Sequence, residues 1–502
     1  MNPIEEQKDS DDVAGDIVIG LVGPVGCDLS RIEDALGRAL SRFEYQQRIH
    51  KLSQLFEDDA VARAVGAVDR SSEFARIRSA MDAGDNLRRS SGQKHIMALH
   101  AASEIASGRQ RGGDALLPMS RVAHVIHSLK RKEEAIALRE IYGARFMLIS
   151  VYVPRAERVE RLMKKAMSES EALLLVLRDE EGGHDFGQAT SDTFQLADLF
   201  LDGRSRPDDI ELEVVRFLDL LFGSRLVTPR RDEHAMFAAF SSSLRSGDLS
   251  RQVGAAITDS RGAILAMGCN DAPKFGGGQY WPEDDDSRDL ALGEDSNDRI
   301  RRQMARNLLV EIGKFQPGRD ELEQETELLK KVGILDITEF GRAVHAEMAA
   351  VTDCARRGVS TQGAYLYCTT FPCHNCVKHL VAAGIEQVYF IEPYPKSRAL
   401  ELHGDSVSIS DLSSGRLRLL PFFGIGPRRY VELFMLQEPS GERIRRKGAQ
   451  GKVVNWSRSG ASPVLQERLM SYIEREQLAT RTMQDVKQQL EQVAANKGGA
   501  SR

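Results

Sequence analysis

Two short motifs of this 502-residue chain hold three side chains that bind zinc and one carboxylate. His345 and Glu347 belong to the sequence His-Ala-Glu, whereas Cys373 and Cys376 belong to Pro-Cys-His-Asn-Cys. Zn²⁺ binds imidazole nitrogen and thiolate sulfur, and a catalytic site uses three protein ligands and leaves the fourth position to water. The sequence therefore predicts a catalytic zinc site with His345, Cys373 and Cys376 as ligands.

Glu347 has a separate role in this interpretation. Zinc lowers the pKa of its water toward neutrality, so that a hydroxide nucleophile is available. We expect Glu347 to take the proton of that water and to pass it to the substrate, as a general acid/base that does not bind the metal. Pro372 suits the start of a helix, whose positive dipole end stabilises thiolates, and a spacing of three puts both cysteines on one helix face.

A structural zinc site, or a reduced cysteine pair that only packs, is the alternative. A closed structural site needs a fourth protein ligand. The other cysteines, Cys27, Cys269, Cys354 and Cys368, include no second Cys-x-x-Cys pair. Cys354 and Cys368 have apolar neighbours, among which a free cysteine is usually buried. The motifs therefore favour a catalytic metal.

The elements around the two motifs are predicted to form an α/β domain. In chain order they are strands at 253–259 and 263–269, a helix at 342–357, a strand at 363–369, a helix at 373–383 and a strand at 387–391. The first two strands form a hairpin with a Ser-Arg-Gly turn. A later strand, helix and strand imply a parallel crossover, which places the starts of both metal-bearing helices on one side of the sheet.

Four motifs together resemble the deoxycytidylate deaminase branch of the cytidine deaminase-like fold. They are Ser250-Arg-Gln-Val-Gly254-Ala, Gly268-Cys-Asn270-Asp-Ala-Pro273 and the two zinc motifs. The resemblance implies a cytidine deaminase-like α/β/α domain that removes the amino group of a deoxycytidine nucleotide. It also implies that Asn270 contacts the sugar or the base. A turn-forming asparagine at a strand end is the alternative.

Further residues are similar to those of bacterial two-domain antiphage dCTP deaminases: Glu392-Pro-Tyr394-Pro-Lys396-Ser397, then Glu401-Leu-His403. This resemblance runs over nearly the whole chain. It implies free dCTP and dCMP as substrates, depletion of dCTP during phage infection, an inhibitory small RNA as a partner, and a homo-oligomer. Lys396 and Arg398 are the best-placed basic residues near the site and are predicted to bind phosphates, with a solvated turn as the alternative.

Composition limits these interpretations. A length of 502 residues predicts two or more domains, and a net charge of −6 gives no general basic surface for nucleic acid. Six cysteines without a paired framework, and a polar N-terminus without an apolar leader, favour a cytoplasmic protein. No apolar run is long enough to span a membrane.

The chain is predicted to divide near Pro229. The predicted parts are a flexible N-terminus at 1–15, an α/β domain at 16–225, the deaminase at 228–438 and a polar C-terminal extension at 439–502. An insertion at 274–340 interrupts the deaminase and holds an acidic run at 283–286 and an amphipathic stretch at 297–314. We expect the acidic run to be a solvated loop. A lid or an oligomer contact is the alternative.

The first α/β domain opens with an apolar strand that runs into a glycine-rich turn with Gly20, Gly23 and Gly26. Such a turn before a helix is typical of phosphate-binding loops, in which backbone N–H groups bind an anion. Cys27 and Asp28 stand where a hydrolytic P-loop has Lys and Ser/Thr, so we expect no ATP turnover. A turn that needs glycine only for close packing is the equal alternative.

Several later segments resemble a nucleoside monophosphate kinase-like fold, which implies a P-loop kinase-like regulatory domain without phosphotransfer. These segments are Val125-Ile-His-Ser128-Leu-Lys130-Arg, Arg139-Glu-Ile-Tyr142-Gly, 146–153 and Ala197-Asp198-Leu-Phe-Leu-Asp202. In the C-terminal extension, apolar residues recur at helical spacing, which predicts a helix that docks onto its own domain or binds a partner. They are Leu469, Ile473, Met483, Val486, Leu490 and Val493.

Two other functions are open. An editing deaminase that acts on tRNA or single-stranded nucleic acid has the same zinc motifs, but it requires a basic groove, and the acidic balance of this chain counts against one. A nucleotide-sensing binding protein with a vestigial deaminase is the other, and the intact zinc ligands and Glu347 argue against it.

Overall fold

The computed structural model describes residues 15–112, 118–181, 188–316, 320–321, 323, 340–393, 397–409, 415–437, 445–447, 452–464 and 471–499. The described chain divides into two units. Unit 1 combines the residues up to Pro229 with those from Phe423 onward, and unit 2 runs from Arg230 to Phe422. The sequence assigned residues up to 438 to the deaminase, whereas residues 423–437 fold with unit 1 because β12 (Gly424–Ile425) pairs with β5 (Leu199–Asp202).

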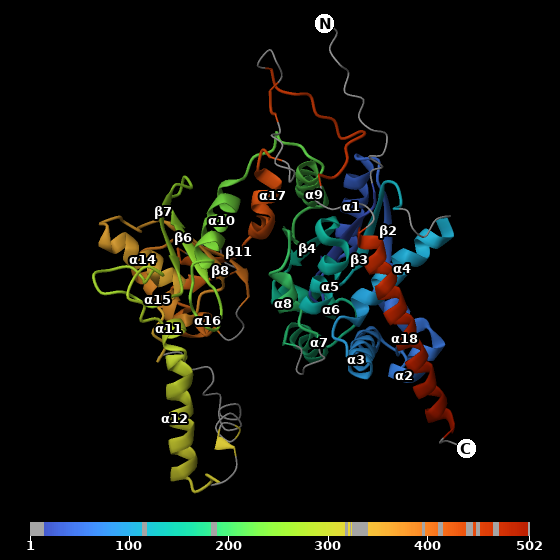
Figure 1. Cartoon of the computed structure of the whole chain (residues 1–502), viewed down its shortest axis with the longest axis horizontal. Coiled ribbons are helices and arrows are strands. Elements are labelled where there is room, and N and C mark those ends of the chain that lie inside the picture. Colours follow the sequence, from blue (N-terminus) through green and yellow to red (C-terminus); the bar gives the residue numbers. More distant parts are fainter. Residues whose placement is uncertain are drawn as a thin grey trace. The chain divides into compact units, whose positions relative to one another are not determined.

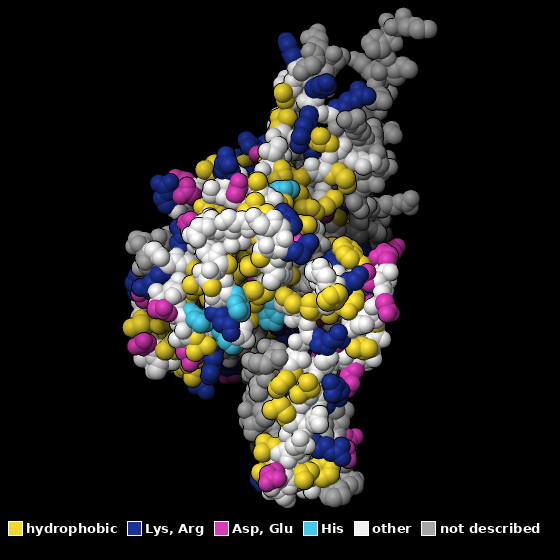
Figure 2. Space-filling model, turned by 90° about the vertical axis from the view of Figure 1, so that its left-hand side faces the viewer, with side chains coloured by type: hydrophobic (Ala, Val, Ile, Leu, Met, Phe, Trp, Pro, Cys, Tyr) yellow, Lys and Arg dark blue, Asp and Glu magenta, His cyan; other side chains and the backbone are white. Residues whose placement is uncertain are grey.

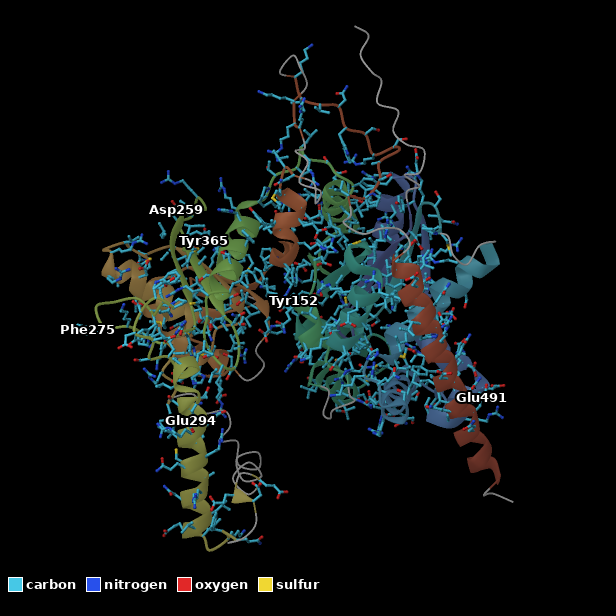
Figure 3. All side chains as sticks on the ribbon, viewed as in Figure 1. Tyr152, Asp259, Phe275, Glu294, Tyr365 and Glu491 are labelled. Carbon is cyan, nitrogen blue, oxygen red and sulfur yellow. The ribbon has the colours of Figure 1, made fainter. Side chains whose placement is uncertain are left out.

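Unit 2 is built on a mixed sheet with the strand order β10-β11-β9-β8-β6-β7. Its strands are β6 (Gly254–Thr258), β7 (Ile264–Cys269), β8 (Tyr365–Thr370), β9 (Gln387–Glu392), β10 (Val407–Ser408) and β11 (Leu417–Pro421). β6 and β7 form the predicted antiparallel hairpin, in whose turn Asp259 accepts the backbone N–H groups of Arg261 and Ala263 (Figure 3). β8 and β9 are parallel, which confirms the predicted crossover.

Helices cover both faces of this sheet (Figure 1). On one face, α14 (Ala346–Arg356) and α15 (His374–Ala382) pack through apolar side chains against β6, β8 and β9. On the other face lies α10 (Arg231–Ser243), whose Asp232 accepts a hydrogen bond from the Tyr367 hydroxyl of β8. The short α16 (Ala399–His403) follows β9. Unit 2 therefore has the α/β/α layers expected from its sequence.

The helix predicted at 342–357 begins later, at Ala346. Val344 and Asp271 exchange backbone hydrogen bonds, and this bridge keeps the chain extended through His345. The strongly helix-forming sequence Ala-Glu-Met-Ala-Ala then starts α14. A long-range backbone pairing thus overrode the helical spacing of the residues before His345.

The insertion between β7 and α14 contains α11 (Asp289–Leu292) and α12 (Ser296–Glu311) among its described residues. α12 extends away from the sheet of unit 2 (Figure 1), and the exposed ring of Phe275 points outward near the start of the insertion (Figure 3). The acidic run is a surface loop, as expected, with Glu283 and Asp285 exposed and its other two carboxylates in ion pairs. Asp284 pairs with Lys274, and Asp286 pairs with Arg288.

Unit 1 is built on a mainly parallel sheet with the order β12-β5-β4-β1-β3-β2. Its other strands are β1 (Ile17–Val22), β2 (Gln46–Lys51), β3 (Val122–His127) and β4 (Phe146–Tyr152). Its helices are α1 (Ser30–Ser41), η1 (Leu52–Glu57), α2 (Asp59–Val65), α3 (Glu73–Ser91), α4 (Ile96–Gly112), α5 (Lys132–Tyr142), η2 (Gly143–Arg145), α6 (Arg155–Met163), α7 (Glu169–Glu181), α8 (Thr190–Phe194), α9 (Pro207–Leu221), η4 (Pro427–Arg429) and α17 (Tyr430–Phe434). α1 and α9 pack together over the apolar side chains of β1, β4 and β5.

The C-terminal helix α18 (Ser471–Gly499) docks onto unit 1, as its apolar spacing predicted. It packs on α4 and α2, and of the apolar residues named from the sequence Ile473, Met483, Val486 and Leu490 are buried. Leu469 lies outside the described residues, and the side chain of Val493 is not described. A buried ion pair reinforces the docking, because Arg109 Nε donates to Glu476 Oε2 over 2.9 Å. Across the described ranges, none of the helices has both the length and the apolarity needed to cross a bilayer.

Candidate zinc-binding active site

His345, Cys373 and Cys376 come together in unit 2 as predicted. His345 Nδ1 lies 3.4 Å from Cys373 Sγ and 3.3 Å from Cys376 Sγ. Zn–S and Zn–N bonds of about 2.3 and 2.0 Å in a tetrahedral site put nitrogen and sulfur about 3.5 Å apart. The separations and the donor set of one nitrogen and two sulfurs therefore fit Zn²⁺, with one coordination position left over.

The helix starts position these ligands. His345 immediately precedes the first turn of α14, and Cys373 is the N-cap residue of α15, where its Sγ accepts the backbone N–H of Cys376 over 3.4 Å. β7 also lies close to α14, because a Cβ on Gly268 would stand 2.4 Å from the Ala346 carbonyl oxygen. The missing side chain at Gly268 therefore lets the metal-bearing helix approach the sheet.

The close approach of the three ligand groups lowers the pKa of the Cys373 thiol and raises the pKa values of the Cys376 thiol and the His345 imidazole, so zinc binding releases protons from the last two. Interactions with Cys376 and His345 lower the pKa of the Cys373 thiol to about 4, against the opposing effect of burial. The hydrogen bond with Cys373 raises the pKa of His345 to about 9. Cys373 is accordingly a thiolate near neutral pH, and the thiolate is the form that binds zinc.

Glu347 lies beside the ligands on the first turn of α14, with 4% of its surface exposed. Burial raises the pKa of its carboxyl above the ordinary value, although His345 and Cys376 oppose this rise. A carboxyl whose pKa is moved toward neutrality both accepts and releases a proton at physiological pH. The position and the environment of Glu347 suit the predicted acid/base role.

A cavity of about 240 Å³ opens onto this group. Its walls come from the segments 248–253, 341–347 and 370–374, and from Asp295 and Asn297 of the insertion. Asn270 also lines the cavity, with 7% of its surface exposed. Its Oδ1 accepts the N–H of Val253 over 2.7 Å, and its Nδ2 donates to the carbonyl of Arg251 over 2.8 Å. The side chain of Asn270 therefore holds the backbone at 251–253 in one wall of the cavity. The sequence predicted instead that this side chain contacts the sugar or the base of the substrate.

The two residues predicted to bind phosphates are placed differently. Lys396 lies outside the described residues. The side chain of Arg398 is 67% exposed, stands 3.5 Å from Glu401 in an ion pair, and is not among the residues that line the cavity. The guanidinium in the cavity wall is that of Arg251, which lies 3.7 Å from Glu392.

The cavity wall also contains residues to which sequence reasoning gave no role, among them Arg251, Asp295, Asn297 and His374. Arg251 stands within a motif already noted, so its charge was an available signal. The Nδ1 of His374 is buried and has no hydrogen-bond partner among the described residues. Nothing in the local sequence marks Asp295 or Asn297, because only the folding of the insertion brings them to the cavity.

The glycine-rich turn of unit 1 binds a carboxylate of the protein itself. The N–H of Val25 donates to Asp179 Oδ2 over 2.8 Å, and Lys130 Nζ donates to Asp179 Oδ1 over 2.9 Å. Gly26 has a φ of +88°, and a Cβ there would stand 2.8 Å from the carbonyl oxygen of Arg158. Gly20 and Gly23 have apolar side chains at 2.7 Å from the place of a Cβ. Close packing thus accounts for glycine at all three positions.

The fold of unit 2, its His/Cys/Cys group and the adjoining glutamate define a zinc-binding deaminase region. Residues 229–392 match the family model described as the cytidine and deoxycytidylate deaminase zinc-binding region.

Individual proteins are similar over parts of the chain. ComE operon protein 2 of Bacillus subtilis is 47% identical over 53 residues, which are 11% of this chain and 28% of that protein. A probable deoxycytidylate deaminase of Drosophila melanogaster is 28% identical over 182 residues, 36% of this chain and 69% of that protein. The chain spans less than a third of the length of the first curated relatives that it matches.

Among solved structures, the chain is similar to the dCMP deaminase of the cyanophage S-TIM5 in complex with dCMP and dUMP. The sequence identity is 20% and the TM-score 0.23, over 39% of this chain and 99% of that chain.

Proposed function

We propose that the chain is a zinc-dependent deaminase that hydrolyses free deoxycytidine nucleotides, dCTP or dCMP, to the deoxyuridine nucleotide and ammonia. The observation that carries this proposal is the buried carboxyl of Glu347 beside His345, Cys373 and Cys376 at the wall of one cavity. An acid/base beside a three-ligand metal group is the arrangement that hydrolytic deamination of a nucleobase requires.

The reaction replaces the exocyclic amine at C4 of cytosine with oxygen from water. A bound Zn²⁺ supplies Lewis-acid chemistry that makes water nucleophilic near neutral pH. Glu347 accepts the proton that water loses as its oxygen bonds to C4, and delivers protons to ring nitrogen N3 and to the departing amine. The C4–N bond breaks and ammonia leaves. The raised pKa of Glu347 matches this exchange of protons in both directions.

The walls of the cavity support a small nucleotide as the substrate. Arg251 contributes to the wall, where a phosphate can compete with Glu392 for its guanidinium. Lys396 and Arg398 stay candidates for more distant phosphates of dCTP, because both follow β9 in the sequence.

A nucleic-acid substrate has less support. On the face of the molecule drawn in Figure 2, Lys and Arg side chains are interspersed with Asp, Glu and apolar side chains. Together with a net charge of −6, this mixture favours a free nucleotide, because binding a polynucleotide backbone relies on clustered cations.

For the whole protein we infer a regulatory role for unit 1, a homo-oligomer, and depletion of dCTP in antiphage defence under the control of an inhibitory small RNA. The motif resemblance to antiphage dCTP deaminases supports the homo-oligomer and the RNA-controlled role in antiphage defence. The parallel β5-β4-β1-β3-β2 order supports a P-loop kinase-like unit 1. The contact of Asp179 with that turn supports the loss of phosphotransfer.

The proposal is tested by incubating the purified full-length chain with dCMP, dCTP, CTP, deoxycytidine and a tRNA, and by measuring ammonia release. We expect release with the deoxycytidine nucleotides and loss of release on removal of zinc with a chelator. Release from the tRNA alone would support an editing deaminase. No release from any substrate by a zinc-loaded chain would contradict deamination.

A further inference from the structure

The carboxylate of Asp271 joins three parts of unit 2. Its Oδ2 accepts the backbone N–H of Gly247 over 3.2 Å and lies 3.3 Å from Arg288 of the insertion. The backbone of Asp271 also exchanges hydrogen bonds with Val344, which directly precedes the metal ligand His345. Asp271 and Arg288 are both buried. A buried charge-assisted contact of this kind fixes geometry, because separating its partners leaves a desolvated charge.

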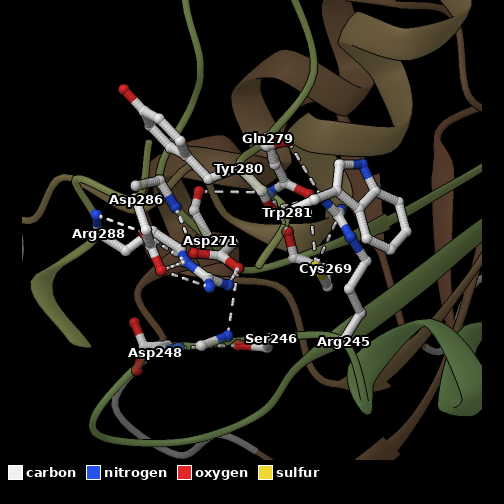
Figure 4. A network of polar contacts seen from close by, with 12 residues as sticks. Arg245, Ser246, Asp248, Cys269, Asp271, Gln279, Tyr280, Trp281, Asp286 and Arg288 are labelled. Carbon is white, nitrogen blue, oxygen red and sulfur yellow. Dashed lines mark hydrogen bonds and ion pairs between the residues drawn. The ribbon is translucent and has the colours of Figure 1, made fainter. Parts of the chain in front are cut away.

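Arg288 ties the insertion to this carboxylate (Figure 4). Its Nε and its second terminal nitrogen donate to the carboxylate of Asp286 over 2.9 and 2.7 Å, while the first faces Asp271. The guanidinium is therefore fixed in orientation by one carboxylate and bound to the deaminase core by the other.

A second contact fastens the start of the insertion. Arg245, the second residue after α10, donates to Gln279 Oε1 over 2.8 Å and to the carbonyl of Tyr280 over 3.0 Å. Its guanidinium also lies 3.9 Å from the ring centroid of Trp281. In Figure 4, Arg245 with Trp281 and Arg288 with Asp286 lie on opposite sides of Asp271.

The contacts of Arg288 with Asp271 and Asp286, called the clamp from here on, are connected to the cavity through the residue next to Arg288. Asp289, next to Arg288, accepts the N–H and the hydroxyl of Ser296 over 3.0 and 2.9 Å, and also accepts from Arg342 over 3.2 Å. Asp295 and Asn297 flank Ser296, and both line the cavity. The position of this wall therefore depends on the segment that Arg288 holds.

We propose that Arg288 is a positioning residue that keeps the insertion in place as a wall of the deaminase cavity, where Asp295 and Asn297 form a subsite for the sugar of the nucleotide. This inference rests on the proposed function. The base must present its C4 amine to the metal ligands and Glu347, so its sugar lies toward the other walls. A carboxylate and an amide accept and donate hydrogen bonds to sugar hydroxyl groups.

The test compares Arg288→Met with Arg306→Met in the full-length zinc-loaded chain. Arg306 is a matched control, because it is a half-exposed arginine of the same insertion that pairs with Glu321 over 2.7 Å. For Arg288→Met we expect a KM for dCMP raised about tenfold or more, with unchanged zinc content and a smaller change in kcat. Arg288→Lys should recover part of the loss. Arg306→Met should leave KM unchanged.

Asn297→Ala keeps the proposal testable if Arg288→Met does not fold, because it removes a wall amide and leaves the clamp intact. It should raise the KM for dCMP in a folded, zinc-loaded protein. An unchanged KM in Asn297→Ala would overturn the sugar subsite, and an unchanged KM in folded Arg288→Met would overturn the positioning role.

Amide hydrogen exchange separates this inference from the proposed function, because it needs no activity. In Arg288→Met we expect faster exchange at the start of α12 and at Val344, with no such change in Arg306→Met. If wild-type protein deaminates nothing, deamination and the sugar subsite both fail, and exchange alone decides the clamp. Unchanged exchange in Arg288→Met would overturn the clamp whatever the substrate.

Discussion

Asp271 and Val344 exchange two backbone hydrogen bonds, with N···O distances of 3.3 and 2.9 Å. Asp271 is the second residue after β7, and Val344 directly precedes His345. The end of the hairpin therefore fixes the chain from which the histidine ligand projects. Because the bridge uses backbone groups, the position of His345 depends on the pairing itself rather than on the side chains at these two positions.

Replacing Glu347 with Gln should abolish deamination while zinc stays bound. The carboxyl moves protons and is not part of the ligand group, so the rate should fall by a factor of about 100 or more. Ammonia release and zinc content by atomic absorption measure the two effects. Glu401→Gln, on the exposed α16, serves as the control and should change neither. Loss of zinc from Glu347→Gln would mean that the glutamate acts as a ligand.

Cys373→Ala or Cys376→Ala should lose both zinc and activity, because two ligands do not hold Zn²⁺ tightly. Cys354→Ala is the matched control. Cys354 is a buried cysteine of α14 that packs in the apolar core, so its replacement should reduce stability and leave zinc bound. Full zinc occupancy in the Cys373 or Cys376 variant would contradict the assigned ligands.

Arg251→Ala should raise the KM for dCMP about tenfold, because its guanidinium lies in the cavity wall and a bond to a charged phosphate is lost. Arg398→Ala should have a smaller effect, since this side chain lies outside the cavity wall. Steady-state kinetics with dCMP, dCTP and deoxycytidine measure the dependence on phosphate. A larger effect of Arg398→Ala on dCTP would restore the phosphate contact first predicted from the sequence.

Unit 1 should become less stable as the pH falls from about 6.5 toward 4. Burial lowers the pKa of His50 to about 3 and that of His100 to about 4. The unfolded chain, with histidine pKa values near 6.5, binds protons that the folded chain does not, so the free energy of unfolding decreases with falling pH. The slope is at most about 1.4 kcal/mol per pH unit for each histidine.

Denaturant unfolding of the full chain at several pH values, with hydrogen exchange in α4 to follow unit 1, measures this slope. The double variant His50→Gln with His100→Gln should flatten it. His379→Gln replaces an exposed histidine of unit 2 and should not. An equal slope in the double variant and in wild type would show that other groups control the acid response.

Gly26→Ala should destabilise unit 1 by about 2 kcal/mol, because its φ of +88° disfavours a side chain and the new Cβ meets the Arg158 carbonyl oxygen. Gly66→Ala is the matched control. Gly66 has a φ of +110°, but no atom lies within 4 Å of the place of its Cβ. The loss should therefore be smaller at Gly66, and zinc content should be unchanged in both. Equal losses would mean that contact with Arg158 contributes nothing.

The sequence alone determined the chemistry of the zinc group and the local elements that carry it. The spacing of Cys373 and Cys376, the position of Glu347 two residues after His345, and the Ser-Arg-Gly turn between β6 and β7 are local patterns that each element's own geometry turns into a shared face or a hairpin. For the same reason, the apolar spacing of α18 predicted a docked helix.

Only the tertiary structure decided which distant segments complete the cavity and each unit. Asp295 and Asn297 reach the wall because Arg288 pairs with Asp271, seventeen residues earlier in the chain. Likewise β12 pairs with β5 in the sheet of unit 1, although all of unit 2 lies between these two strands in the sequence. Asp179 accepts a hydrogen bond from the glycine-rich turn, 154 residues earlier in the chain. Such pairings depend on burial and on charge partners that meet only after the chain has folded, so local spacing carries no signal for them.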